Sequence, residues 1–123
     1  MHSRVLVELV ENSMNDLKAA DIRILDVSAM TSITDFMVIA SGTSDRHVRS
    51  IADHVVERAK QAGHGALGIE GHEYGDWVLV DLGDVVVHVM QPATRVFYKL
   101  ENLWAMQEQS GAAGGVPSGP TSS

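Results

Sequence analysis

The residues best suited to chemistry lie in one short segment, Ser41-Gly42-Thr43-Ser44-Asp45-Arg46-His47, between an apolar run and an amphipathic stretch. Ser44, Asp45 and His47 are the residue types of nucleophilic catalysis, but neighbours in sequence need not have the reactive geometry. The small residues at 41–44 would also let backbone N–H groups at a helix N-terminus bind phosphate. The Walker lysine and the GxGxxG pattern are both absent. A serine cap followed by a first-turn acid explains the same residues, so we interpret the segment as a helix start.

Six histidines and several carboxylates raise the question of a metal site. His47 and His54 would share a helix face only loosely, and the sequence has no HExxH motif. A two-metal nucleotidyl-transfer site needs paired carboxylates, as in D-x-D. Ser28 stands two positions after Asp26, and Val86 two positions after Asp84. The sequence therefore predicts no metal, no cofactor and no catalytic residue.

A second group of residues suits binding rather than catalysis. Its members are charged, aromatic or sulfur-containing side chains at 70–90: Glu70, His72, Tyr74, Asp76, Trp77, His88 and Met90. Trp and Tyr are over-represented at interface hot spots, and Met suits adaptable binding surfaces. Alternatively, Trp77 packs in the core and His88 is a buried, hydrogen-bonded histidine.

Apolar periodicity and turn residues give the elements that would position these groups. We expect an N-terminal helix with Leu6, Leu9, Val10 and Leu17 on one face. Strands follow at 21–27 and 36–42, then a helix that begins at a Ser44 or Thr43 cap and ends at Gly63. Next come a strand at 67–70, a hairpin at 76–90 that reverses at 82–84, and a helix at about 93–106. The apolar positions expected on the second helix are Val48, Ile51, Ala52, Val55 and Ala59, and those on the last helix are Val96, Phe97, Leu100, Leu103 and Trp104. This order predicts an α/β fold with a mixed sheet of about five strands and flanking helices.

The hairpin is apolar on both alternations, so both faces of the sheet need cover. We assign one set as Trp77, Leu79, Val85, Val87 and Val89, and the other as Val78, Val80, Leu82, Val86 and Met90. If the helices cover one face, a partner would cover part of the other, because monomers rarely leave a large apolar patch bare.

Composition limits the class of protein. The 123 residues predict one domain, and 16 acidic against 9 basic residues argue against direct nucleic-acid binding and for a basic partner. The absence of cysteine, of a long apolar run and of a signal-peptide pattern predicts a soluble cytoplasmic protein. The segment 107–123 is rich in Gly, Ser and Pro, so we expect a disordered tail after a domain at 1–106.

Five sequence blocks in the same order carry a resemblance to a known family. They are LDV at 25–27, TSITDFMVIASGTSDRHVRSIAD at 31–53, LGIEG at 67–71, DWVLVDLGDVVVHVM at 76–90 and RVFYKLENLW at 95–104. Together they resemble the ribosomal silencing factor family, called RsfS in bacteria and Iojap in plants.

The resemblance implies a translational repressor with a nucleotidyltransferase-like fold that lacks catalytic carboxylates. Its partner would be ribosomal protein L-fourteen of the large subunit, whose association with the small subunit it blocks sterically under nutrient limitation. A homodimer is implied off the ribosome. The partner-facing residues carried over are Trp77, Asp76, Leu82, His88 and Met90, with Glu70 and Tyr74 as further candidates. The competing interpretations are a small nucleotidyltransferase or phosphate-binding enzyme, and a dimeric scaffold for another basic partner.

Overall fold

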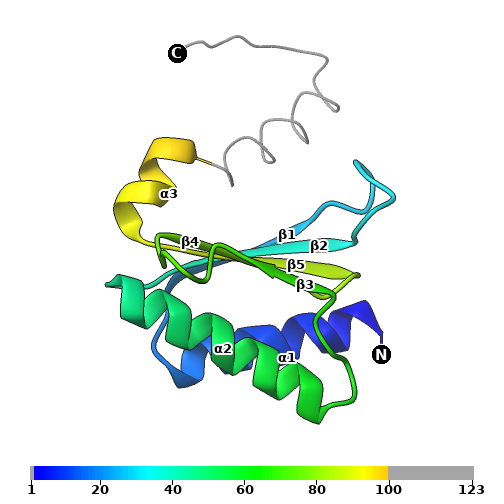
Figure 1. Cartoon of the computed structure of the whole chain (residues 1–123). Coiled ribbons are helices and arrows are strands. Elements are labelled where there is room, and N and C mark those ends of the chain that lie inside the picture. Colours follow the sequence, from blue (N-terminus) through cyan, green and yellow to red (C-terminus); the bar gives the residue numbers. More distant parts are fainter. Residues whose placement is uncertain (1, 100–123) are drawn as a thin grey trace, which may run out of the picture.

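The structure, a computed structural model, describes residues 2–99 (Figure 1). Its elements are α1 (Ser3–Asp16), β1 (Ala20–Asp26), β2 (Phe36–Ser41), α2 (Asp45–Gln61), β3 (Gly68–Glu70), β4 (Trp77–Asp81), β5 (Val85–Met90) and α3 (Pro92–Tyr98). The predicted order of helices and strands is confirmed. The predicted tail at 107–123 and the second half of the predicted last helix lie outside the described residues.

The strands form one mixed sheet in the order β1-β2-β5-β4-β3. β2 and β5 are parallel, and the other three pairs are antiparallel. All six residues of β2 are buried, as expected for a continuous apolar run between two covered faces. The predicted five-stranded mixed sheet is confirmed, with β1 and β3 as its edges.

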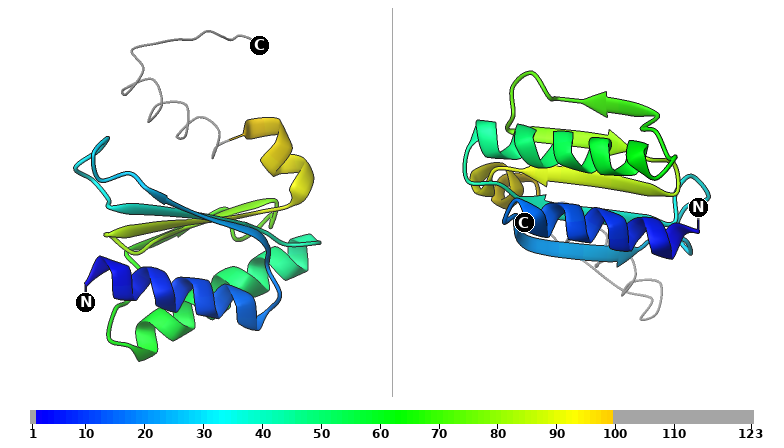
Figure 2. Two further views of the ribbon diagram at one scale, coloured as in Figure 1. Left: turned by 180° about the vertical axis from the view of Figure 1, so that it is seen from behind. Right: turned by 90° about the horizontal axis from the view of Figure 1, so that it is seen from below.

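Helices α1 and α2 lie side by side on one face of the sheet, and α3 lies against the other (Figures 1 and 2). The predicted stripe of α2 is buried in full: Val48, Ile51, Ala52, Val55 and Ala59. These side chains pack with Leu6 and Val10 of α1 against the sheet. The expectation that all helices cover one face is therefore wrong for α3.

The hairpin register corrects the predicted division of its side chains between faces. Three residues, 82–84, separate the two strands, so each odd-numbered position pairs with an even-numbered one. Trp77 therefore pairs with Met90, and Val78 with Val89. Val78, Val80, Val85, Val87 and Val89 all belong to the core under α1 and α2. Alternation along each strand therefore places Trp77, Leu79, Val86, His88 and Met90 on the opposite face.

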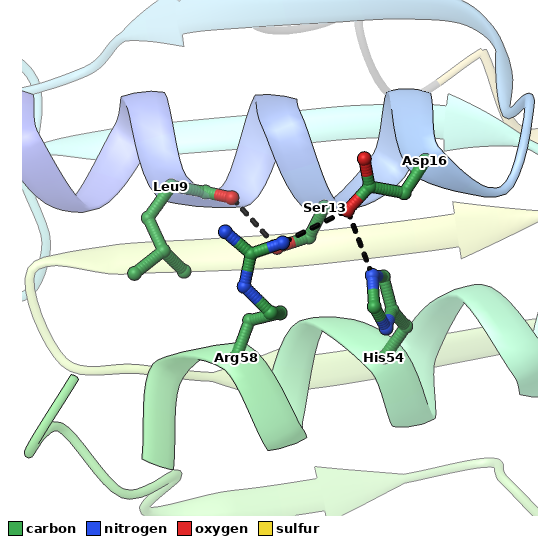
Figure 3. Close-up of polar contacts among 5 residues, drawn as sticks. All are labelled: Leu9, Ser13, Asp16, His54 and Arg58. Carbon is green, nitrogen blue, oxygen red and sulfur yellow. Dashed lines mark hydrogen bonds and ion pairs between the residues drawn. The ribbon is translucent and has the colours of Figure 1, made fainter. Parts of the chain in front are cut away.

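Polar contacts join the two long helices at their exposed side (Figure 3). Asp16 Oδ2 lies 2.9 Å from Nε2 of His54 and accepts a hydrogen bond of 2.8 Å from Nη1 of Arg58. The hydrogen bond with His54, helped by the charge of Arg58, lowers the pKa of Asp16. On the same helix, Ser13 is buried and donates its hydroxyl to the Leu9 carbonyl, so it leaves no polar group unpaired.

Helix α3 differs from its predicted pattern. We expected Val96 and Phe97 on its apolar face, but their side chains are 67% and 78% exposed. Arg95 is buried instead, and its Nη1 donates a 2.9 Å hydrogen bond to Oγ of Ser41 at the end of β2. A side chain with a long apolar stem and several donors can fill such a position if its charged head finds acceptors.

Candidate partner-binding site

A shallow groove of about 290 Å³ lies where β3 meets the start of β4, lined by Glu70, Gly71, Asp76, Trp77 and Leu79. Glu70 on β3 pairs with Leu79 on β4, so the end of β3 lies beside the strand that carries Trp77. Glu70 and Asp76 are exposed, whereas Trp77 and Leu79 are half-buried. The groove thus combines two half-buried apolar side chains with two exposed carboxylates, and Oδ1 of Asp76 accepts a 3.0 Å hydrogen bond from the Trp77 N–H.

The loop between these strands is held by backbone geometry. Gly71 has φ +79°, and a Cβ built there would overlap the carbonyl oxygen of Trp77. Gly75 has φ +74° and is buried against Asp45 and Arg49 of α2. Both positions require glycine, since other residues rarely adopt this conformation and neither position has room for a side chain. The backbone of the loop therefore approaches Trp77 more closely than a side chain at position 71 would allow.

Side-chain contacts tie the same loop to α2 and to the end of β5. Nε2 of His72 lies 2.8 Å from Oδ1 of Asp53. Nε2 of Gln91 donates a 3.1 Å hydrogen bond to the Gly75 carbonyl. Tyr74, in the same loop, is 74% exposed.

The side chain of Trp77 is held by a hydrogen bond to His88 on the neighbouring strand. Its indole Nε1 donates a 3.0 Å hydrogen bond to Nδ1 of His88, and its ring lies 4.8 Å from that of Tyr98. His88 is 5% exposed, and burial lowers its pKa to about 4. A neutral imidazole can accept the indole proton at Nδ1 only in the tautomer that carries its own proton on Nε2. His88 is therefore neutral near pH 7 and orients the indole.

Three backbone N–H groups of the Ser41–His47 turn already have acceptors, and that of Gly42 donates to the Met90 carbonyl. The Thr43 N–H donates to Nδ1 of His47, and the His47 N–H donates to Oγ of Ser44, at 2.8 and 3.0 Å. Asp45 accepts from the Arg49 side chain and from the Arg46 N–H, and these contacts lower its pKa. The predicted Ser44 cap is confirmed. With these groups paired, the described geometry favours a helix start over a phosphate cradle or a serine–histidine pair.

Two further features concern ligands and membranes. Within residues 2–99, no three His, Asp or Glu side chains gather closely enough to hold a metal ion. No helix in that same range is long and apolar enough to cross a membrane.

Comparison with known proteins decides the family. Residues 1–120 match the family described as "Ribosomal silencing factor during starvation". The chain belongs to this family. It is 46% identical to the ribosomal silencing factor RsfS of Chromobacterium violaceum, over 93% of each chain. It is 45% identical to RsfS of Haemophilus influenzae, over 81% of this chain and 98% of that protein.

Solved structures agree with this assignment. A crystal structure of a Chromobacterium violaceum protein superposes with a TM-score of 0.83 at 41% identity, over 100% of this chain and 95% of the other. A Bacillus halodurans protein gives a TM-score of 0.76 at 38% identity, over 82% and 94%. The mixed five-stranded sheet with flanking helices is therefore the fold of this silencing-factor family member.

The residues predicted to face a partner separate into three groups. Glu70, Asp76 and Trp77 meet in the groove, and Tyr74 lies exposed on the loop beside it. His88 is buried and reaches the groove only through Trp77. The side chains of Leu82 and Met90 are 1% and 0% exposed, so both lie in the interior of this chain, and their contact with a partner stays a prediction.

Sequence reasoning missed Leu79 as part of the groove. Leu79 stands two positions after Trp77 on the same strand, so the alternation of side chains places both on one face. That period-two signal was available in the sequence. The partner-facing role of Leu82 came from the family resemblance, whereas the alternation of side chains had already grouped it with Val80, with which it packs in the core.

Proposed function

We propose that the chain represses translation by binding the large ribosomal subunit through ribosomal protein L-fourteen. Its bulk would then block association with the small subunit when nutrients are limited. The action is steric and needs no catalytic step. Membership of a family described as silencing ribosomes during starvation supports this proposal. We further propose that it acts in the cytoplasm and forms a homodimer off the ribosome.

We propose the groove at Trp77 as the docking surface because its residues suit a basic partner. A basic ribosomal protein can place an apolar side chain on Trp77 and Leu79 while its cations face Glu70 and Asp76. Aromatic anchors ringed by polar groups are the usual hot spots of protein interfaces. The formal net charge of −7 also favours encounter with a basic partner.

The neighbouring edge strand extends this surface. β3 has three residues and lies at the edge of the sheet, where a strand presents unpaired backbone groups. Ile69 on β3 is 43% exposed, and Leu67 just before it is 75% exposed. The proposed docking surface therefore comprises the groove, the β3 edge and Tyr74.

Retention on purified large subunits tests this surface. We expect Glu70→Lys and Asp76→Lys each to weaken binding, because each replaces an attractive charge by a repulsive one. Glu57→Lys, an exposed acid on α2, makes the same charge change on the opposite face and should bind like wild type. Equal losses for all three variants would show that only net charge matters and would refute the groove.

Trp77→Ala tests the anchor itself. A central aromatic anchor contributes about 2 kcal/mol or more, so retention should weaken about thirtyfold or more. Because the change also removes the donor to His88, a circular dichroism melt must first show that the variant folds. Unchanged binding by the folded variant would remove Trp77 from the docking surface. Retention on the small subunit alone would favour a different basic partner.

A further inference from the structure

The loop at 71–76, between β3 and β4, lies along one ridge of α2. A Cβ at Gly75 would come within 2.7 Å of Nη1 of Arg49. One turn further along the helix, Oδ1 of Asp53 lies 2.8 Å from Nε2 of His72. Arg49 and Asp53 are four residues apart, so they are neighbours on the helix surface. The loop therefore contacts α2 at two points.

The second half of this loop is also held by the end of β5. The Gln91 N–H donates to the Asp76 carbonyl at 3.0 Å, and Nε2 of Gln91 donates to the Gly75 carbonyl at 3.1 Å. Backbone pairing of β4 with β5 begins at the next residue, Trp77. Asp76 and Trp77 should therefore keep their places when the contact at His72 is removed.

The first half of the loop has fewer restraints. The N–H groups of Tyr74 and Gly75 donate to the Gly71 carbonyl at 3.3 and 3.2 Å, which closes the turn on itself. Among residues 2–99, the contact of His72 with Asp53 is the one hydrogen bond that joins the turn at 71–74 to a helix. Tyr74 is 74% exposed, so its direction depends on the backbone of this turn.

We propose that His72 and Asp53 are positioning residues for the docking surface: their contact orders the turn at 71–74 and so presents Tyr74 to the basic ribosomal protein. The inference rests on the proposed function and names how one part of that docking surface is held. Ordering a loop before the encounter reduces the conformational entropy lost on binding, which raises affinity without a new contact. The side chains of His72 and Asp53 are 43% and 63% exposed, so we expect a modest effect.

Substitutions that remove or keep each half of this contact test the proposal, by retention of the full chain on purified large subunits. A carboxylate only accepts, so Nε2 of His72 is the donor. His72→Ala removes the donor and Asp53→Ala the acceptor, so each should weaken binding about two- to fivefold. His72→Gln keeps an N–H donor and Asp53→Asn keeps an oxygen acceptor, so each should bind more tightly than the alanine variant at its position.

The double alanine variant separates positioning from direct contact with the partner. If His72 and Asp53 act only through each other, the double variant should bind no more weakly than either single variant. Losses that add would mean that the two residues meet the partner separately, which contradicts the proposal.

His54→Ala is the matched control, because it breaks a contact of the same kind elsewhere on α2. Nε2 of His54 lies 2.9 Å from Oδ2 of Asp16, which joins α2 to α1 instead of to the loop (Figure 3). This variant should bind like wild type. A loss as large as that of His72→Ala would show that the loop has no special part in binding, and the proposal would fail.

Amide hydrogen exchange gives a readout that needs no ribosome. In both alanine variants we expect faster exchange at Tyr74 and Gly75, whose N–H groups close the turn, and unchanged exchange along β2. Unchanged exchange at these two amides, or wild-type retention of both alanine variants, would overturn the inference and leave the proposed function standing. A wild-type chain that large subunits do not retain would refute the proposed function and this inference together.

Discussion

The indole of Trp77 on β4 donates its proton to Nδ1 of His88 on β5, at 3.0 Å. The two residues stand on adjacent strands and their ring centroids are 5.9 Å apart. His88 is therefore both an acceptor for the proposed anchor and a buried titratable group. If its imidazole gains a proton, Nδ1 becomes a donor and the hydrogen bond to Trp77 is lost.

The stability of the fold should depend on pH through His88. Its pKa falls from 6.5 to about 4 on folding, so between these values the unfolded state binds more protons. Stability is then complete above about pH 6.5 and decreases as the pH falls towards 4, by roughly 2 kcal/mol at pH 5. Urea unfolding at pH 7 and pH 5 measures this difference.

His88→Gln keeps an acceptor for the indole and does not titrate, so it should flatten this pH dependence. His2→Gln, at the exposed N-terminus, is the matched control and should retain the wild-type slope. An unchanged slope in the His88 variant would assign the effect to another group.

Two glycines with left-handed backbones should respond differently to alanine. Gly63→Ala places a Cβ in open space, so it costs only the conformational strain of about 1 kcal/mol. Gly71→Ala adds an overlap with the carbonyl oxygen of Trp77 and should cost clearly more. Thermal melts compare the two. A similar cost for both would mean that the loop moves away from Trp77 easily.

Leu82→Ala and Tyr74→Ala should have opposite effects: the first should lower stability, and the second should weaken binding to the large subunit. Leu82 is 1% exposed, so its truncation should lower the free energy of unfolding by about 2–5 kcal/mol. Tyr74 is 74% exposed, so its truncation should leave stability nearly unchanged and weaken large-subunit binding. Chemical denaturation and subunit pull-down give the two readouts. A stable Leu82 variant would contradict its placement in the core.

Asp16→Asn should weaken the contact between α1 and α2. The substitution removes the charge that accepts from Arg58 and pairs with His54. Because all three side chains are substantially exposed, we expect a small loss of stability that disappears at high salt. Melts at low and high ionic strength test this. A loss of stability that persists in high salt would require a role for Asp16 beyond its charge.

Much of the fold could be predicted from local patterns. The apolar run at 36–41 and the stripe of Val48, Ile51 and Val55 have one consistent interpretation each, and the Ser44 cap marks the start of α2. The turn residues at 82–84 likewise predicted where the hairpin reverses, as the strand pairing confirms. These elements depend on contacts between near neighbours in the sequence, which periodicity reports well.

The exposure of individual side chains could not be predicted in the same way. Hairpin register decides which face Trp77 and Met90 share, and it depends on how many residues the turn contains. Arg95 lies buried beside Ser41, 54 positions earlier in the chain, which accepts one of its hydrogen bonds. Local periodicity cannot predict a contact between residues that are so far apart in the sequence. The groove itself joins the ends of two strands, and only their pairing brings Glu70 to Leu79.

We propose that this chain keeps the two ribosomal subunits apart by occupying their contact surface. Sucrose-gradient sedimentation of purified subunits, mixed after saturating the large subunit with the chain, tests it most directly. We predict separate subunit peaks with the chain in the large-subunit fraction, and recovery of the joined ribosome with Asp76→Lys. Joined ribosomes that still carry the wild-type chain would rule out steric blocking.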